Sequence, residues 1–383
     1  MAPSNGTNFP SAFNPVTCLR RGLCPVTKIQ QRSGSATIIA SATSSVLGGH
    51  SLYYEQHGKP GSDPVTGAKH KILFIMGLNS TSFSWGPQVR YFGGGREGGD
   101  CTALVFDNRG VGNSDYPKGP YTSSGMAEDA ICLLDYLGWT GDREIHVVGI
   151  SLGGMIAQEL AFRIPHRICS LVLAVTTPGS RAGGFSLSHT TPWKGVSSLL
   201  KLTFTTDPRK KALIALGMLF PEKWLNEVAE TDPHAEWPRN GNTKDNEQHK
   251  TNRDVQMEGF LYRADITKPQ LFGGNLSQTL AALTHNFQPE RLAYIAANIP
   301  KIAIVTGDED HLVNPTGSER LHRFMKRASD PSGGESSVEY LTWEGTGHAI
   351  HSQREKLFNG LVERCAVEGR SMIDNGWKGK DVS

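Results

Sequence analysis

Long apolar runs are missing from this 383-residue sequence. A helix that crosses a bilayer needs about 20 consecutive apolar residues, and no stretch approaches that length. The first residues, MAPSNGTNFPSAFNPVTCLRRG, also lack the apolar core of a secretory signal. The sequence therefore predicts a cytoplasmic protein without stable membrane insertion. A basic, Ser/Thr-rich N-terminus with no acidic residue before Glu55 makes mitochondrial import the alternative.

Paired cysteines and an excess of one charge are missing as well. The six cysteines are scattered, with no CxxC and no Cys/His spacing of the kind that zinc sites use. We therefore expect no metal, no cofactor and a reducing compartment. The formal net charge is only +2 and no long basic stretch occurs, which gives nucleic acid little to bind. A small-molecule substrate is the expected partner, and the pattern specifies no oligomeric state.

Short β-type runs alternate with longer helical ones from about residue 50 onward. This alternation predicts an α/β fold in which a mostly parallel sheet is covered by crossover helices. The predicted strands are 51–58, 71–76, 103–106, 144–149, 170–175, 301–307 and 337–343. The predicted helices are 124–138, 152–164, 315–328 and one after His348.

The alternation breaks once, between residues 180 and 298. A structureless loop of that length is uncommon in a compact domain, and segments such as WKGVSSLLKL and KKALIALGMLF have helical length and spacing. We interpret 180–298 as a helical cap inserted into a core formed by 46–179 and 299–367. Residues 1–45 are expected to be a poorly ordered extension, and 368–383 a C-terminal tail.

The sequence Gly149-Ile150-Ser151-Leu152-Gly153 lies between a predicted strand, EIHVV, and a predicted helix, LGGMIAQELAF. Strand, sharp turn and helix is the context that a G-x-S-x-G nucleophile elbow requires. Ser151 is therefore the candidate nucleophile. A serine hydroxyl is a poor nucleophile near neutral pH, so it needs a base that is oriented in turn by a carboxylate.

Acidic residues and a histidine follow two later strands, in the chain order serine, acid, histidine that this fold uses. Asp308-Glu309-Asp310-His311 follows KIAIVTG, and Glu344-Gly345-Thr346-Gly347-His348 follows SVEYLTW. Three carboxylates compete for the role of the acid, and His351 competes with His348 for the role of the base.

Four motifs make residues 50–367 resemble the α/β-hydrolase superfamily, most closely its capped esterase and haloperoxidase-like branch, which includes the aclacinomycin methylesterases. They are the elbow GISLGGMIAQ, the segment DNRGVGNS at 107–114, the G-x-x-D segment at 307–310, and the pair Gly347-His348. The resemblance implies an α/β-hydrolase fold with an eight-stranded type of sheet. It also selects Asp310 as the acid and His348 as the base.

The resemblance further implies backbone N–H groups that stabilise an oxyanion, from Leu152 after the nucleophile and from Leu78 in the loop Met76-Gly77-Leu78-Asn79. It implies a structural turn for 107–114. The expected enzyme is a serine hydrolase that cleaves a carboxylic ester of a small, apolar substrate through an acyl-enzyme. The alternatives are thioesterase, lactonase, amidase or perhydrolase activity in the same site, or a non-catalytic ligand-binding protein of the same fold.

Overall fold

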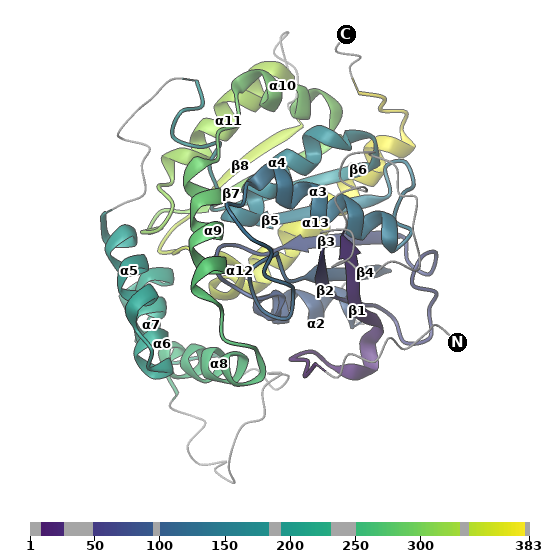
Figure 1. Ribbon diagram of the computed structural model, residues 1–383. Coiled ribbons are helices and arrows are strands. Elements are labelled where there is room, and N and C mark those ends of the chain that lie inside the picture. Colours follow the sequence, from purple (N-terminus) through teal and green to yellow (C-terminus); the bar gives the residue numbers. More distant parts are fainter. Residues whose placement is uncertain are drawn as a thin grey trace.

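An eight-stranded sheet runs through the computed structural model, which describes residues 9–26, 49–94, 100–183, 193–230, 250–329 and 337–379 (Figure 1). The strand order is β1-β2-β4-β3-β5-β6-β7-β8. β1 pairs antiparallel with β2 and β2 with β4, and all other pairs are parallel. The strands are β1 Cys18–Val26, β2 His50–His57, β3 His70–Ile75, β4 Cys101–Phe106, β5 Ile145–Ile150, β6 Ile168–Ala174, β7 Lys301–Gly307 and β8 Val338–Trp343.

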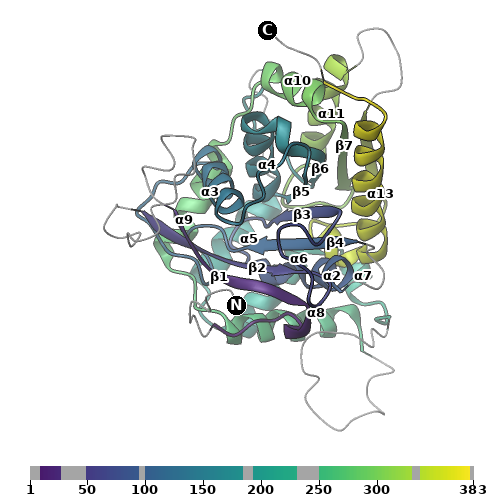
Figure 2. The ribbon, with the colours of Figure 1, turned by 90° about the vertical axis from the view of Figure 1, so that its right-hand side faces the viewer.

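Helices cover both faces of the sheet. α2 (Gly86–Gly93) and α13 (Glu355–Asp374) lie on one face, and α3 (Ser123–Tyr136), α4 (Leu152–Arg163) and α11 (Thr316–Ser329) lie on the other (Figure 2). The short elements are α12 Ile350–Gln353 and the 3-10 turns Pro15–Thr17, Ser82–Trp85 and Pro165–Arg167. The predicted α/β fold is confirmed. None of the described helices combines the length and the apolar character that spanning a bilayer would require.

The central strands are apolar on both faces because both faces are covered. In β3, Ile72 and Phe74 belong to the apolar cluster beneath α2 and α13, and Leu73 and Ile75 belong to the cluster beneath α3 and α4. Because successive side chains of a strand point to opposite faces of the sheet, β3 contributes to two separate apolar cores. Packing of helices on both faces of the sheet fixes the positions at which the parallel strands end.

In the described parts of the interval 180–298, which are 180–183, 193–230 and 250–298, five helices lie beside the sheet and a sixth packs elsewhere (Figure 1). The five are α5 Trp193–Phe204, α6 Pro208–Leu219, α7 Glu222–Leu225, α8 Asn252–Ile266 and α9 Phe272–Thr284. The sixth, α10 (Pro289–Asn298), packs on α4 and α11. We call α5 to α9 the cap helices.

The expectation of a poorly ordered extension over 1–45 is wrong for its middle part. β1 is the edge strand of the sheet, and its alternate residues Gly22, Cys24 and Val26 are buried against β2 and α3. Basic residues and Pro25 interrupt the apolar pattern of this strand, so the alternation of buried and exposed residues cannot be recognised in its sequence. Residues 1–8 and 27–48 lie outside the described residues.

The expected C-terminal tail, 368–383, is also corrected in part. α13 continues to Asp374, so residues 368–374 are helical. Gly369 lies against the Cys169 carbonyl of β6, where a Cβ would come within 2.6 Å of the carbonyl oxygen. The helix therefore keeps contact with the sheet beyond the predicted end of the core.

Replacing Val26 tests whether β1 belongs to the folded core. Val26 is 0% exposed and Val16, just before the strand, is 67% exposed. Val26→Ala should lower the free energy of unfolding by about 1–3 kcal/mol because it opens a cavity. Val16→Ala should change it by less than about 0.5 kcal/mol. Urea denaturation of both variants measures the difference, and equal effects would mean that β1 contributes no core packing.

Candidate functional site

Ser151 occupies a sharp turn between β5 and α4. Its φ is 56° and its ψ is −122°, a backbone conformation that residues with side chains rarely adopt. A Cβ on Gly149 would overlap the Gly153 carbonyl oxygen, and a Cβ on Gly153 would overlap the Ile75 carbonyl oxygen of β3. Both glycines are therefore required for the strand, the turn and the helix to pack this closely.

His348 and Asp310 are in direct contact. His348 Nδ1 lies 2.8 Å from Asp310 Oδ2, and the two residues are 5% and 3% exposed. The other carboxylate oxygen, Oδ1, accepts the N–H groups of Leu312 at 2.8 Å and Val313 at 2.9 Å. Because both oxygens of the carboxylate accept hydrogen bonds, His348 Nδ1 is the donating nitrogen. His348 Nε2 can therefore interact with a different group.

The neighbouring acids take no part in this contact. Asp308 and Glu309 are exposed, whereas Asp310 is buried. The Asp308 carboxylate accepts the Thr346 N–H at 3.2 Å, and the Glu309 N–H donates to the Thr346 carbonyl at 3.0 Å. These two residues therefore tie the loop after β7 to the loop after β8.

His351, the other candidate base, lies in a separate apolar environment. Its Nε2 is 3.2 Å from the Ser84 carbonyl oxygen, and its ring centre is 4.9 Å from that of Trp85. Burial lowers the pKa of His351 to about 3, so the ring stays neutral near neutral pH. This neutral ring serves as a packing residue beneath α13.

The predicted residues follow three strands of the parallel part of the sheet, and so they meet at its carboxyl edge. Ser151 follows β5, Asp310 follows β7 and His348 follows β8. The Ser151 backbone is joined to the intervening strand, because its N–H donates to the Ala174 carbonyl at 3.0 Å. Ligands of open α/β folds bind at this edge.

The loop after β3 passes directly beside Ser151. A Cβ on Gly77 would lie 3.0 Å from Ser151 Cβ and 3.6 Å from its Oγ, so the loop approaches the hydroxyl only because this residue is glycine. Leu78 follows in this loop. Leu152 is the first residue of α4, where a backbone N–H has no partner within the helix.

Two glutamines that the sequence did not single out hold this loop. Gln278 of α9 is 0% exposed: its Oε1 accepts the Asn79 N–H at 2.8 Å, and its Nε2 donates to the Arg109 carbonyl at 2.8 Å. Gln270 donates to Asn79 Oδ1 and to the Gly110 carbonyl, both at 2.9 Å. Asn79 is thus an anchor for the cap helices. Only the tertiary fold joins residues so distant along the chain.

The segment 107–114 is a buried structural turn, as its resemblance implies. Asp107 accepts the Ser82 N–H at 2.7 Å and the Asn113 N–H at 2.8 Å. Burial raises the pKa of Asp107 to about 6, and these hydrogen bonds oppose that rise. Arg109 pairs with the buried carboxylate of Asp129. Asp107 therefore joins this segment to the residues after β3, and Arg109 joins it to α3.

A second contact joins the cap helices to the loop after β8, which carries His348 and which we call the histidine loop. The Ala349 N–H donates to the Leu219 carbonyl at 3.1 Å, and Ala349 shares an apolar cluster with Leu216, Phe220 and Leu225. The end of α6 therefore lies against the residue that follows His348. Among the described residues, no group of three metal-ligating side chains gathers at this edge.

Comparison with known proteins gives one family match and several relatives. The family model described as alpha/beta hydrolase fold matches residues 72–355. "Putative carbamate hydrolase RutD" of Azorhizobium caulinodans is 28% identical over 186 residues, which are 46% of this chain and 57% of that protein. Across the first curated relatives, the matched region spans between 28% and 59% of their length.

Solved structures share the fold over nearly their whole length. A thermophilic esterase from Thermogutta terrifontis superimposes with a TM-score of 0.59 at 16% identity, covering 91% of this chain and 99% of that one. The enol-lactonase from Burkholderia xenovorans LB400 gives a TM-score of 0.59 at 19% identity, covering 84% and 97%. At these identities the likeness concerns the fold alone.

Removing the Gln278 amide tests the link between α9 and the loop beside Ser151. Gln278→Ala deletes both hydrogen bonds, and each is worth about 1 kcal/mol. Hydrogen exchange at the Asn79 amide should therefore accelerate by at least about tenfold. Gln288→Ala is the control, because Gln288 Nε2 donates to Asn286 at 3.0 Å in an exposed pair. Unchanged protection in Gln278→Ala would show that the loop is held by other contacts.

Proposed function

Because the chain belongs to the α/β-hydrolase family, we propose that it is a serine hydrolase that cleaves a carboxylic ester of a small, apolar substrate. The observation that carries this proposal is the buried contact between His348 and Asp310 at the sheet edge where Ser151 ends its strand. A histidine held by a carboxylate is the partner that a serine nucleophile needs.

The proposed reaction proceeds by acyl transfer to water. His348 Nε2 takes the proton of the Ser151 hydroxyl as its oxygen attacks the ester carbonyl, and Asp310 stabilises the imidazolium that forms. The N–H groups of Leu78 and Leu152 stabilise the oxyanion. His348 then donates its proton to the leaving alcohol, and water hydrolyses the acyl-enzyme by the same steps.

The cap helices supply the proposed substrate specificity. They contact the loop after β3 through Gln278 and the histidine loop through Leu219, so they border the Ser151 edge on two sides. The buried apolar side chains of Leu216 and Phe220 lie at this border and favour an apolar substrate.

Lactone hydrolysis is the second candidate. A lactone is a cyclic ester, so the same nucleophile, base and oxyanion donors open it without a change of mechanism. Sequence likeness to "3-oxoadipate enol-lactonase 2" of Acinetobacter baylyi, which is 31% identical over 105 residues, supports this second candidate.

Replacing Ser151 tests the nucleophile. Ser151→Ala should lower kcat for p-nitrophenyl acetate by roughly 10⁶, as loss of a triad serine does in subtilisin. Ser352→Ala is the control, because the Ser352 hydroxyl donates to Gln256 at 3.3 Å and has no role in the proposed reaction. Circular dichroism should report an intact fold for both variants. Activity of Ser151→Ala within tenfold of the wild type would refute the assignment.

Comparing two aspartates tests the acid. Asp310→Asn should lower kcat by about 10³–10⁴, because only this carboxylate sets the tautomer of His348. Asp308→Asn should cost less than about tenfold, since Asp308 is exposed and accepts one backbone hydrogen bond. Steady-state kinetics on one ester decides between them. A larger loss in Asp308→Asn would place the acid elsewhere.

A further inference from the structure

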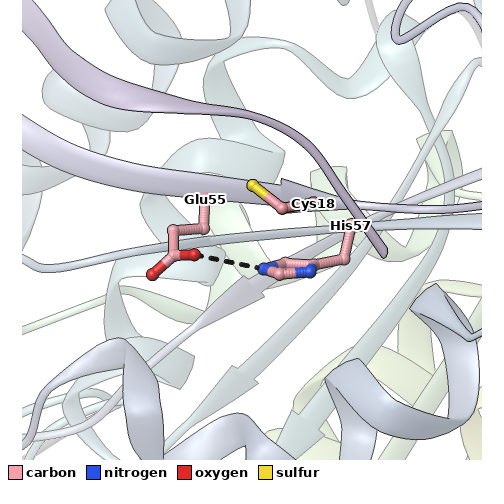
Figure 3. Close-up of side chains that lie close together, drawn as sticks. All are labelled: Cys18, Glu55 and His57. Carbon is pink, nitrogen blue, oxygen red and sulfur yellow. Dashed lines mark ion pairs between the residues drawn. The ribbon is translucent and has the colours of Figure 1, made fainter. Parts of the chain in front are cut away.

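Three side chains with metal-ligating atoms gather where β1 begins and β2 ends. Cys18 is paired with His57 across the two strands, and Glu55, two residues before His57, projects from the same face of β2. Their sulfur, carboxylate and ring-nitrogen atoms lie within 4.8 Å of one another. Figure 3 shows the Glu55 carboxylate turned toward the His57 ring, with Cys18 beside both.

The hydrogen bonds around His57 fix which ring nitrogen is free. Nδ1 lies 3.0 Å from Thr17 Oγ1, and the Thr17 hydroxyl donates its only proton to the Asn14 carbonyl at 3.1 Å. Thr17 can therefore only accept from His57, so Nδ1 carries the proton. In a neutral ring, Nε2 then presents a bare lone pair. This atom is fully buried and makes no hydrogen bond.

Hydrogen bonds hold both oxygens of the Glu55 carboxylate in place. Tyr53 donates its hydroxyl to Oε1 at 2.6 Å, and Ser11 donates its hydroxyl to Oε2 at 2.9 Å. Glu55 is 1% exposed. A buried carboxylate oxygen that faces a nitrogen lone pair is repelled by it unless a cation lies between them.

The spacing between the two groups favours a metal ion over a proton. Glu55 Oε2 and His57 Nε2 are 3.4 Å apart. A proton shared by a charged pair draws nitrogen and oxygen to about 2.7–2.9 Å. A tetrahedral zinc ion, with bonds of about 2.0–2.2 Å to nitrogen and oxygen, separates the two ligand atoms by about 3.4 Å.

We propose that Cys18 Sγ, Glu55 Oε2 and His57 Nε2 bind one Zn²⁺ ion, with water as the fourth ligand. Sulfur, imidazole and carboxylate are a ligand set that zinc accepts, and Thr17 orients the imidazole as the outer partner of a metal-bound histidine does. Cys18 is only half-buried, so the ion can enter from its side of the cluster.

Binding at this site releases a proton from the thiol. Burial, and then the charge of Glu55, raise the pKa of Cys18 to about 11, so the free thiol is protonated near neutral pH. As the sulfur–zinc bond forms, the sulfur–hydrogen bond breaks and the proton passes to water. No redox change is involved.

The zinc site lies away from the proposed catalytic residues. His57 pairs with Ala103 near the beginning of β4, whereas Ser151, Asp310 and His348 follow the carboxyl ends of parallel strands. A metal here would fasten β1 to β2 at the opposite edge of the sheet. The proposal therefore does not depend on the hydrolase reaction.

Cobalt titration of the chelator-treated full-length chain tests the site. Co²⁺ replaces Zn²⁺ in tetrahedral sites and reports a bound thiolate by a sulfur-to-cobalt charge-transfer band. The wild type should develop this band with about one Co²⁺ per chain, and Zn²⁺ should abolish it. Cys18→Ser should lose the band and bind Zn²⁺ at least about tenfold more weakly by calorimetry. Cys132→Ser, which removes a buried thiol from α3, should keep both.

Ester hydrolysis by Cys18→Ser should equal that of the wild type, which shows that the variant is folded and separates this proposal from the catalytic one. His57→Gln provides a second ligand variant, with circular dichroism as its folding control. The proposal is overturned if the wild type forms no thiolate–cobalt band, or if the band and the Zn²⁺ affinity survive in Cys18→Ser.

Discussion

The close packing of the Ser151 turn against β3 is the constraint on which the remaining architecture depends. The turn holds Ser151 at a positive φ. Because Gly149 and Gly153 have no Cβ atoms, the carbonyl groups of Gly153 and Ile75 can pack against them. Such a conformation persists only where the surrounding structure over-determines it. Here the buried strand β5, the helix α4 and the two apolar cores together supply that rigidity.

The cap helices form hydrogen bonds with loops on both sides of the Ser151 turn. Gln278 joins α9 to the loop that approaches the Ser151 hydroxyl, and the Leu219 carbonyl joins α6 to the loop that carries His348. A shift of either helix must therefore move a loop beside the proposed nucleophile. If the cap helices bind the substrate as proposed, these hydrogen bonds connect the binding surface to the loops beside Ser151 and His348.

Much of this arrangement could be predicted from the sequence because it depends on local patterns. β3 to β7 are largely apolar runs bounded by turns, β8 is a β-type run that contains polar residues, and the motif around Ser151 follows from its strand and helix. The edge strand β1 was missed, since Pro25 and basic residues interrupt its alternation. The partners of Gln278 and the cluster of Cys18 with His57 were missed for another reason: strand pairing and helix docking bring these residues together, and no sequence spacing records such contacts. The prediction of no metal was drawn from spacing alone.

The proposed reaction depends most on the identity of the nucleophile, which covalent trapping tests directly. The wild-type protein would be treated with a fluorophosphonate, which transfers a phosphonyl group to an activated serine, and the modified peptide would be sequenced by mass spectrometry. We predict one phosphonyl group per chain, carried by Ser151, with loss of ester hydrolysis in proportion to labelling. Labelling at another residue, or full hydrolysis by a chain already labelled at Ser151, would contradict it.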